Sequence, residues 1–324
     1  MTIHVLCLNP AIDKLYEIDG FTAGEDYPGQ RPRVLIGGKG VNAALLLSQL
    51  GENERLYAFV GEMSIAAFEQ EMKPRCECMF IPVPGACRTT VNVIDRQNDR
   101  ETVITEAGPE VNKAHVAALL DALEEKIGED DFVVCSGSII AGAPGDIYAR
   151  VSRLATQKGA RCAIDCNVNA LPLSLEHTHY ALAKPNEREL CALLSHPRTQ
   201  DAGTLAQYAR EVKSVDTLLI SMGGEGGLLV SGQRVLAARV PDEKIVSTVG
   251  SGDASLAGAV SAMARGMTME ETLRLSMACG VANAVRGEVG SIRMQDIARI
   301  APNIEIEELC LFIKGGRTDD LRNI

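Results

Sequence analysis

Aromatic and basic residues are scarce in this sequence. It has no tryptophan, six tyrosines and six phenylalanines in 324 residues, and its 32 lysines and arginines stand against 43 acidic residues, for a formal net charge of -11. Nucleic-acid binding needs a basic surface and usually stacking aromatic rings. We therefore expect no nucleic-acid partner and favour a small-molecule partner, which would need a local basic pocket if it is an anion.

Long apolar runs are also missing. The longest stretch without a charged side chain, residues 132–145, has 14 residues and includes glycines and a proline, whereas a membrane-spanning helix needs about 18 apolar residues or more. The first ten residues carry no Lys or Arg and reach a polar turn at Asn9-Pro10, unlike a secretory signal peptide. We expect a cytoplasmic protein without membrane contact.

Cysteine and histidine clusters at metal-binding spacing are lacking as well. The ten cysteines are scattered, and several fall in apolar runs where thiols pack as small hydrophobes. Cys76 and Cys78 have no second pair at zinc spacing, and His177 and His179 lack an obvious partner set. We expect reduced thiols and no zinc site.

Strands alternating with helices dominate the chain after residue 111. Short apolar runs occur at 132–135, 162–164, 180–183 and 218–221, and helical patterns occur near 113–127, 145–158 and 203–213. Such alternation predicts right-handed βαβ units and a mostly parallel sheet. We therefore predict an α/β fold in which one domain, residues 1–324, holds a doubly wound, mostly parallel sheet flanked by helices.

A second, small β-sheet is predicted from two separate segments. Residues 90–94 and 101–105 have the alternating pattern of two hairpin arms around a polar turn, and short alternating stretches also occur within 14–36. We predict a lid lobe formed by two insertions, 14–36 and 88–107. The polar C-terminal residues 315–324 are predicted to be a loose tail.

Polar or glycine-rich segments follow four of the predicted strands. They are Ser136–Ser138, Asp165–Asn167, Lys184–Glu187 and Ser221–Gly227. In open α/β sheets ligands bind beyond the carboxyl ends of the strands. A binding site is therefore expected at that edge.

The strongest local motif is Ser247–Asp253. Gly250-Ser251-Gly252 precedes a helix of small residues, so backbone N–H groups can converge at the positive end of a helix dipole and cradle an anion. Asp253 has two interpretations: a helix N-cap, or a general base that takes a proton from a hydroxyl while the N–H groups stabilise a transferring phosphoryl group.

A second glycine-rich motif, Gly37-Gly38-Lys39-Gly40, opens a predicted helix over residues 40–50. It lacks the spacing of a Walker A loop, and no dinucleotide fingerprint is present. Glycines would allow close backbone approach to a sugar or anion, and Lys39 adds a positive charge. Taken alone, such a glycine-rich turn is more often a tight turn than a binding site.

Together these motifs resemble the two signatures of the ribokinase-like PfkB family of carbohydrate kinases. The signatures are Ile36–Asn42 and Ser247–Asp253, and Ser136–Ser138, Lys184–Glu189 and Ser221–Gly226 follow the family's order, so the resemblance covers roughly residues 1–300. Leu8–Asp13 with the Gly-Gly-Lys-Gly motif resembles the hexose-phosphate branch, 1-phosphofructokinases and tagatose-6-phosphate kinases.

The resemblance implies a ribokinase-like fold and a site for ATP, magnesium and a phosphorylated sugar. It implies a sugar site of Asp13, Gly37, Gly38, Lys39, Asn42, Arg88 and Ser138. It implies a nucleotide site of Lys184, Asn186, Ser221, Gly223, Gly226, Thr248 and Asn283, the last near the adenine. Asp253 would be the base, with Gly250, Ser251 and Gly252 beside it, and Glu189 would hold Mg2+ through water. The backbone after Ser247 and around Val285 could also hold K+.

The resemblance leaves the acceptor open. We expect phosphorylation of fructose 1-phosphate to fructose 1,6-bisphosphate, with tagatose 6-phosphate as the alternative acceptor and a catalytically silent sugar-phosphate sensor as the alternative of another class. Ser251 replaces the family's commoner Ala, and a small residue still fits the turn. Ile139-Ile140 replaces Leu-Pro, and residues 62–80 look short; these two departures affect the outer wall of the sugar site. A homodimer through the lid lobe is also expected.

Overall fold

The chain was analysed as a computed structural model, which describes residues 1–98 and 100–309. A ten-stranded sheet, in the order β14-β13-β12-β11-β10-β9-β8-β1-β4-β5, forms the body, and a separate sheet has the order β3-β2-β6-β7. The seven strands from β11 to β5 are parallel to one another, and β12, β13 and β14 extend this sheet with antiparallel pairs. The predicted α/β fold, with a mostly parallel sheet and a small second sheet, is confirmed.

The strands have the following bounds: β1 Ile3–Cys7, β2 Ala11–Glu17, β3 Arg33–Gly37, β4 Glu54–Gly61, β5 Glu77–Val83, β6 Arg88–Asp95, β7 Arg100–Thr105, β8 Phe132–Ser136, β9 Arg161–Asp165, β10 Tyr180–Ala183, β11 Val215–Ser221, β12 Gly227–Ser231, β13 Arg234–Arg239 and β14 Glu305–Glu308. The α-helices are α1 Lys39–Gln49, α2 Ile65–Met72, α3 Lys113–Lys126, α4 Ile147–Gln157, α5 Leu171–Leu175, α6 Glu187–Leu193, α7 Ala202–Ala209, α8 Ser251–Ala264, α9 Met269–Arg286 and α10 Met294–Ile300. Short 3-10 helices cover Glu62–Ser64, Gly223–Glu225 and Ala301–Asn303.

Helices cover both faces of the large sheet. One apolar cluster joins it to α1, α2, α8, α9 and α10, and a second joins the opposite face to α3 through α7. The central strands β1 and β8 are buried at every position, as expected for parallel strands with helices on both sides. Burial of this kind explains why their sequences are continuous apolar runs.

The small residues of α8 serve close packing against α9. A Cβ added at Gly258 would lie 2.9 Å from the Leu275 carbonyl oxygen, and one at Gly280 would lie 2.4 Å from Ser255 Oγ. Both distances are too short for a side chain to fit without movement. The two helices therefore approach closely only because these positions are glycine, and this packing fixes the start of α8.

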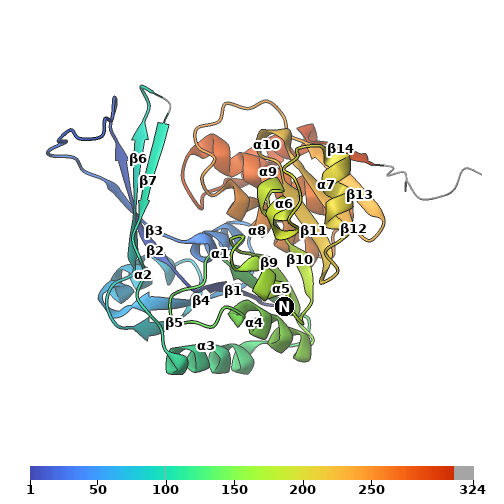
Figure 1. The fold of residues 1–324 in the computed structure, drawn as a ribbon, viewed down its shortest axis with the longest axis horizontal. Helices are drawn as coiled ribbons and strands as arrows, with labels where there is room; N and C mark the ends of the chain where they lie inside the picture. Colours follow the sequence, from blue (N-terminus) through green and yellow to red (C-terminus); the bar gives the residue numbers. More distant parts are fainter. Residues whose placement is uncertain (99, 310–324) are drawn as a thin grey trace, which may run out of the picture.

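The small sheet stands apart from the α/β body, on the left in Figure 1. Strand β2 pairs with β3 in antiparallel fashion and with β6 in parallel fashion, and β7 completes the sheet as an exposed edge strand. Val34, Val103 and Ile104 are all more than half exposed on it. The predicted tail at 315–324 lies outside the described residues, and no helix in the part of the chain that the structure describes is long and apolar enough to cross a membrane.

Candidate active site

The polar segments identified in the sequence meet at the carboxyl ends of β1, β8, β9 and β10. These strands are adjacent and parallel, so Asn9, Ser136, Asp165 and Lys184, which end or follow them, lie along one edge of the sheet. Helix α1 begins at the same edge, because a Cβ at Gly137 would be 3.5 Å from the Cβ of Lys39. The residues predicted beyond the strand ends thus come from four strand ends and the start of α1.

Asp165 lies at the centre of this edge, between two lysines. Its Oδ1 accepts a hydrogen bond from Lys39 Nζ at 2.9 Å, and its Oδ2 lies 3.1 Å from Lys184 Nζ. The Asp165 carboxylate is completely buried, and Lys184 is only 4% exposed. Burial alone would raise the pKa of Asp165, but Lys184 and Lys39 outweigh it and hold that pKa below its usual value.

The arrangement keeps Lys39 charged where an anion would enter. Partial burial alone would lower the pKa of Lys39, but the carboxylates of Asp165 and Asp253 more than offset it and raise that pKa. Lys184 Nζ lies near the start of α8, since a Cβ at Gly252 would be 3.4 Å from it. One buried carboxylate therefore links the lysine predicted for the sugar site to the lysine predicted for the nucleotide site.

Asp253 is buried, at 5% exposure, and its Oδ2 accepts a hydrogen bond of 2.7 Å from Asn42 Nδ2. Burial raises the pKa of Asp253 to about 6; Lys39 lowers it, and the nearby negative charge of Asp165 raises it further. A carboxylate with a pKa near 6 is ionised at neutral pH yet accepts a proton more readily than an exposed one. These properties suit a general base.

The alternative interpretation of Asp253, as a helix N-cap, is wrong. The N-cap of α8 is Gly250, in a left-handed conformation with φ of 81°, and Asp253 is the third residue of the helix. Among the described residues no side chain caps this end. The Ser251 N–H donates to the Thr248 carbonyl oxygen, so the N–H groups of Gly252 and Asp253 are the ones available to a ligand. The Gly250–Asp253 segment therefore has the geometry of the anion cradle that the sequence predicted.

On the sugar side, Asp13 in β2 faces Gly37 in β3. A Cβ at Gly37 would lie 1.9 Å from Asp13 Oδ2, so any other residue there would displace the carboxylate. Gly38 has φ of 109°, and a Cβ there would lie 3.1 Å from both Cys7 Sγ and Pro10 Cα. The two glycines are required for these close approaches, and they bring the predicted Asp13 and Lys39 to one region.

Arg88 and Ser138, predicted to bind the substrate phosphate, meet through Asn9. Asn9 Nδ2 donates to Ser138 Oγ at 3.2 Å, and Arg88 Nε donates to the Asn9 carbonyl oxygen at 3.2 Å. Arg88 begins β6 and pairs with Ala11 of β2. The structure thus brings together two predicted residues from distant segments and adds Asn9, which the sequence analysis had placed only in a turn.

Asn186 and Glu189 form a capping box at the start of α6. Asn186 Oδ1 accepts from the N–H groups of Arg188 and Glu189, and Glu189 Oε2 accepts from the Asn186 N–H at 2.9 Å. Asn186 also forms a β-bridge with Ser221 at the end of β11. Glu189 acts electrostatically on Lys39, so its carboxylate lies within reach of the charged centre, with Oε1 outside the capping box.

The other residues predicted to bind the nucleotide lie in the turn after β11 and in the loop before α8. Gly226 has φ of 96°, and a Cβ there would lie 2.0 Å from the Ala238 carbonyl oxygen, so local packing already requires a glycine. Gly223 also has positive φ, at 60°. Thr248 is exposed, and its carbonyl oxygen accepts from the Ser251 N–H.

Asn283 contacts the loop that precedes α8. It was expected near the adenine, but it is fully buried in α9, and its Nδ2 donates to the Val249 carbonyl oxygen at 2.8 Å. A Cβ at Gly250 would lie 3.4 Å from Asn283 Oδ1. Asn283 therefore holds the Val249–Gly250 loop in place, and its place near the adenine stays a prediction.

Asp165 is the main functional candidate that the sequence analysis left without a role. The sequence feature that could have identified Asp165 is its position at the end of a buried strand, in the segment Asp165–Asn167. Its two partners come from α1 and from the end of β10, distant in the sequence. Only the adjacency of β8, β9 and β10 places them together.

Comparisons with known proteins show what the whole chain is similar to. The model of the pfkB family carbohydrate kinases matches residues 6–296. The chain is 32% identical to 1-phosphofructokinase of Rhodobacter capsulatus over 90% of this chain and 92% of that one, and 28% identical to tagatose-6-phosphate kinase of Staphylococcus epidermidis over 95% and 100%. Phosphofructokinase-2 from Escherichia coli, solved with substrates and products, shares the fold at a TM-score of 0.86, with 22% identity over 94% of this chain and 99% of that one.

Proposed function

The chain belongs to the pfkB family of carbohydrate kinases, and we propose that its acceptor is fructose 1-phosphate, converted with ATP to fructose 1,6-bisphosphate. The general activity, transfer of a phosphoryl group to a sugar hydroxyl, follows from the family. The observation that carries the specific mechanism is the buried Asp253, held by Asn42 at 2.7 Å beside the uncapped start of α8. A base and an anion cradle in contact are what phosphoryl transfer to a hydroxyl requires.

In the proposed reaction Asp253 takes the proton from the acceptor hydroxyl as its oxygen attacks the γ-phosphorus. The backbone N–H groups of the Gly250–Asp253 segment and the ammonium group of Lys184 stabilise the charge on the transferring group. Asn42 orients the carboxylate, and Asp165 holds Lys184 and Lys39 in position. The small sheet, which carries Asp13, would act as a lid that excludes water from the reacting groups.

The phosphate of the acceptor is assigned to Lys39, Arg88 and Ser138. Arg88 and Ser138 share Asn9 as a partner, and Lys39 stays charged between Asp165 and Asp253. A guanidinium and an ammonium group with a hydroxyl suit a phosphate dianion. This local positive charge provides the basic pocket that an acidic protein needs to bind an anionic sugar.

The residues present also suit ATP with a divalent cation. Gly252 leaves room beside Lys184 Nζ that a Cβ would fill, and Glu189 offers a carboxylate oxygen to a water of Mg2+. When bound, the metal neutralises phosphate charge. For K+ we propose the backbone after Ser247 and around Val285, because the N–H groups of Val246 and Ser247 both donate to the Ala284 carbonyl oxygen and so bring the two segments together.

The test is ADP release with Mg-ATP against fructose 1-phosphate, tagatose 6-phosphate, fructose 6-phosphate, fructose and ribose. We expect the largest kcat/KM for fructose 1-phosphate. A larger value for tagatose 6-phosphate would favour the second acceptor, which the 28% identity to a tagatose-6-phosphate kinase supports. Preference for an unphosphorylated sugar would refute the assignment of Lys39 and Arg88, and sugar-phosphate binding without ADP release would favour the sensor.

We further propose that two copies pair through their small sheets in the cytoplasm. The exposed Val34 and Ile104 lie on one face of this sheet, since Ile104 pairs with Val91, Val91 with Lys14 and Lys14 with Val34. An isolated four-stranded sheet with apolar side chains in water gains stability when a second copy covers it. Light scattering should give twice the chain mass of 34.6 kDa; a monomer mass would refute the dimer.

A further inference from the structure

A pair of thiols lies at the far edge of the large sheet, where the kinase reaction does not use it. Cys76 stands in the bend before β5 and Cys78 is the second residue of β5, the edge strand beside β4. Their sulfur atoms are 3.6 Å apart, and both thiols are reduced. We propose that this pair is a modification site, at which a hydroperoxide converts the two thiols to a reversible Cys76–Cys78 disulfide.

The geometry of the backbone permits this bond. Two residues separated by one other have Cα atoms at most about 7 Å apart in a fully extended chain, and closer where the chain bends, as it does at Cys76; disulfides span about 4.4–6.8 Å. The two sulfur atoms already lie next to each other. They need to approach from 3.6 Å to about 2.05 Å, which rotation of the two side chains can supply.

A second close pair of cysteines differs from Cys76 and Cys78 in its access to solvent. Cys135 and Cys162 lie on the neighbouring strands β8 and β9 with their sulfur atoms 4.0 Å apart, but they are 0% and 3% exposed in the core. Burial raises the pKa of Cys135 well above its usual value. A hydroperoxide dissolved in water does not reach them. Cys78, in contrast, is only half-buried, at the edge of the sheet.

The surroundings make Cys78 the attacking sulfur. The two thiols are in hydrogen-bond contact, in which either sulfur can be the donor, and the Cys78 thiol also donates to the Cys76 carbonyl oxygen at 3.4 Å. The contact with Cys76 and the ammonium group of Lys73 lower the pKa of Cys78 despite its partial burial. The contact with Cys78 and its deeper burial raise the pKa of Cys76. Thiolate reactivity follows low pKa and access to solvent, and both favour Cys78.

The proposed reaction balances in two steps. The Cys78 thiolate attacks the peroxide, the O–O bond breaks, and the alcohol (or water, from hydrogen peroxide) leaves with Cys78 as the sulfenic acid. The Cys76 sulfur then attacks the Cys78 sulfur, the S–O bond breaks, and hydroxide leaves as water with the thiol proton. The two thiols lose two electrons in total and the hydroperoxide gains them.

The test uses the full-length protein treated with hydrogen peroxide at about one equivalent, alkylated, and then digested with trypsin and a glutamate-specific protease. Cleavage after Glu77 separates the two cysteines. We expect the dipeptide Cys76-Glu77 to stay linked to the fragment beginning at Cys78 until dithiothreitol is added. Full alkylation of both residues after peroxide would overturn the proposal, as would equal oxidation of Cys135 and Cys162.

Variants test the order of the two steps. In Cys76→Ser, Cys78 should accumulate as the sulfenic acid and be labelled by dimedone, whereas Cys78→Ser should give less than about a tenth of that label on Cys76. Equal labelling of the two variants would refute the assignment of the attacking sulfur. Cys162→Ala is the matched control: it removes one member of the buried pair and should leave the Cys76–Cys78 bond unchanged.

Discussion

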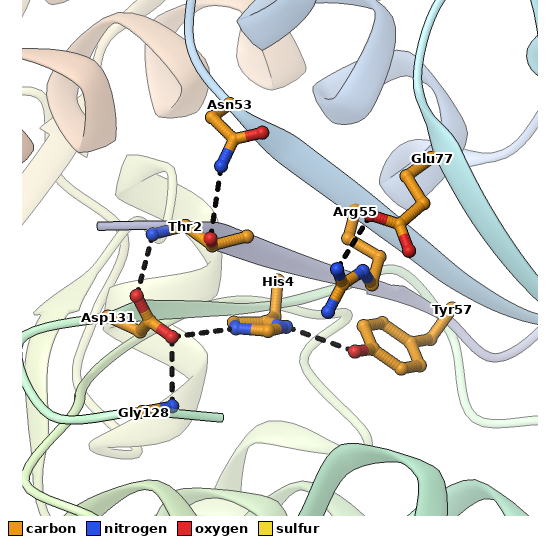
Figure 2. A network of polar contacts seen from close by, with 8 residues as sticks. All are labelled: Thr2, His4, Asn53, Arg55, Tyr57, Glu77, Gly128 and Asp131. Carbon is orange, nitrogen blue, oxygen red and sulfur yellow. Dashed lines mark hydrogen bonds and ion pairs between the residues drawn. The ribbon is translucent and has the colours of Figure 1, made fainter. Parts of the chain in front are cut away.

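The large sheet carries a buried network of ionisable side chains at each end of its central strands, and the two networks differ in how well their charges are satisfied. At the amino ends, His4 of β1 contacts Tyr57 Oη through Nδ1 and Asp131 Oδ2 through Nε2, both at 3.1 Å (Figure 2). Asp131 also accepts from the N–H groups of Thr2 and Gly128 at 2.6 and 2.9 Å. At the carboxyl ends lie Asp165, Asp253 and the two lysines.

The direction of the pKa shifts separates the two networks. Burial lowers the pKa of His4, so that it is neutral. The backbone N–H groups of Thr2 and Gly128, together with His4, overcome burial and lower the pKa of Asp131. The native state therefore favours the ionised form of Asp131, which is also the form of an aspartate in water at neutral pH. Asp253, in contrast, is held ionised at neutral pH against a pKa raised to about 6. A network of satisfied groups stabilises a fold, whereas a carboxylate held against its surroundings is typical of an active site.

The largest effect is expected from Asp253→Asn. Without the base, turnover should fall at least about a thousandfold, while the folded state should not lose stability. The raised pKa means that the ionised carboxylate costs the native state up to about 3 kcal/mol at neutral pH, and an amide avoids this cost. Steady-state kinetics and thermal unfolding measure the two effects. Turnover within tenfold of the parent would refute Asp253 as the base.

Asp165→Asn should have a smaller effect on turnover, about ten- to hundredfold, because it displaces Lys39 and Lys184 without removing a reacting group. It should also move the acid side of the kcat/KM profile to lower pH, since Asp165 raises the pKa of Asp253. A purely structural role would lower activity without this shift. The profile therefore distinguishes a positioning residue from a residue needed only for folding.

Asp131→Ala should affect stability alone. It leaves His4 and two backbone N–H groups without their acceptor, at a cost of about 2–3 kcal/mol, and kcat should stay within twofold of the parent. Asp216→Ala is the matched control: its 2.7 Å contact with His179 is exposed on both sides, so its loss should cost less than about 1 kcal/mol. Urea denaturation of the two variants gives the comparison. Equal costs would show that the His4 network contributes no more than a surface pair.

The smallest change is expected from pH. The base must be ionised, so kcat/KM should fall by about tenfold per unit as pH drops below about 6. The depressed pKa of His4 contributes a loss of stability as pH falls below about 6.5, whereas the raised pKa of Asp253 contributes a gain as pH falls below about 6. Activity and denaturation profiles of the same sample separate these effects. A flat kcat/KM between pH 5 and 7 would contradict the raised pKa of Asp253.

The parallel core and the two glycine-rich motifs could be predicted from sequence because each depends on a short segment. Runs such as 132–135 and 218–221 are apolar because both faces are covered, and the anion cradle depends on consecutive residues at 250–253. The antiparallel strands β12 to β14 were not predicted individually. The roles of Asp165 and Asn283 depend on which strands and helices become neighbours, and no local pattern shows this.

The topology of the small sheet has a consequence for folding during synthesis. Strands β2 and β3 leave the ribosome early and can pair at once, but β6 pairs in parallel with β2 over seven positions, and α1, β4, α2 and β5 must be made first. Contacts between segments so distant in the chain form slowly. The β2–β3 hairpin therefore waits with one edge unpaired while the body of the enzyme assembles beneath it, and slow translation across residues 38–87 would prolong its exposure to aggregation.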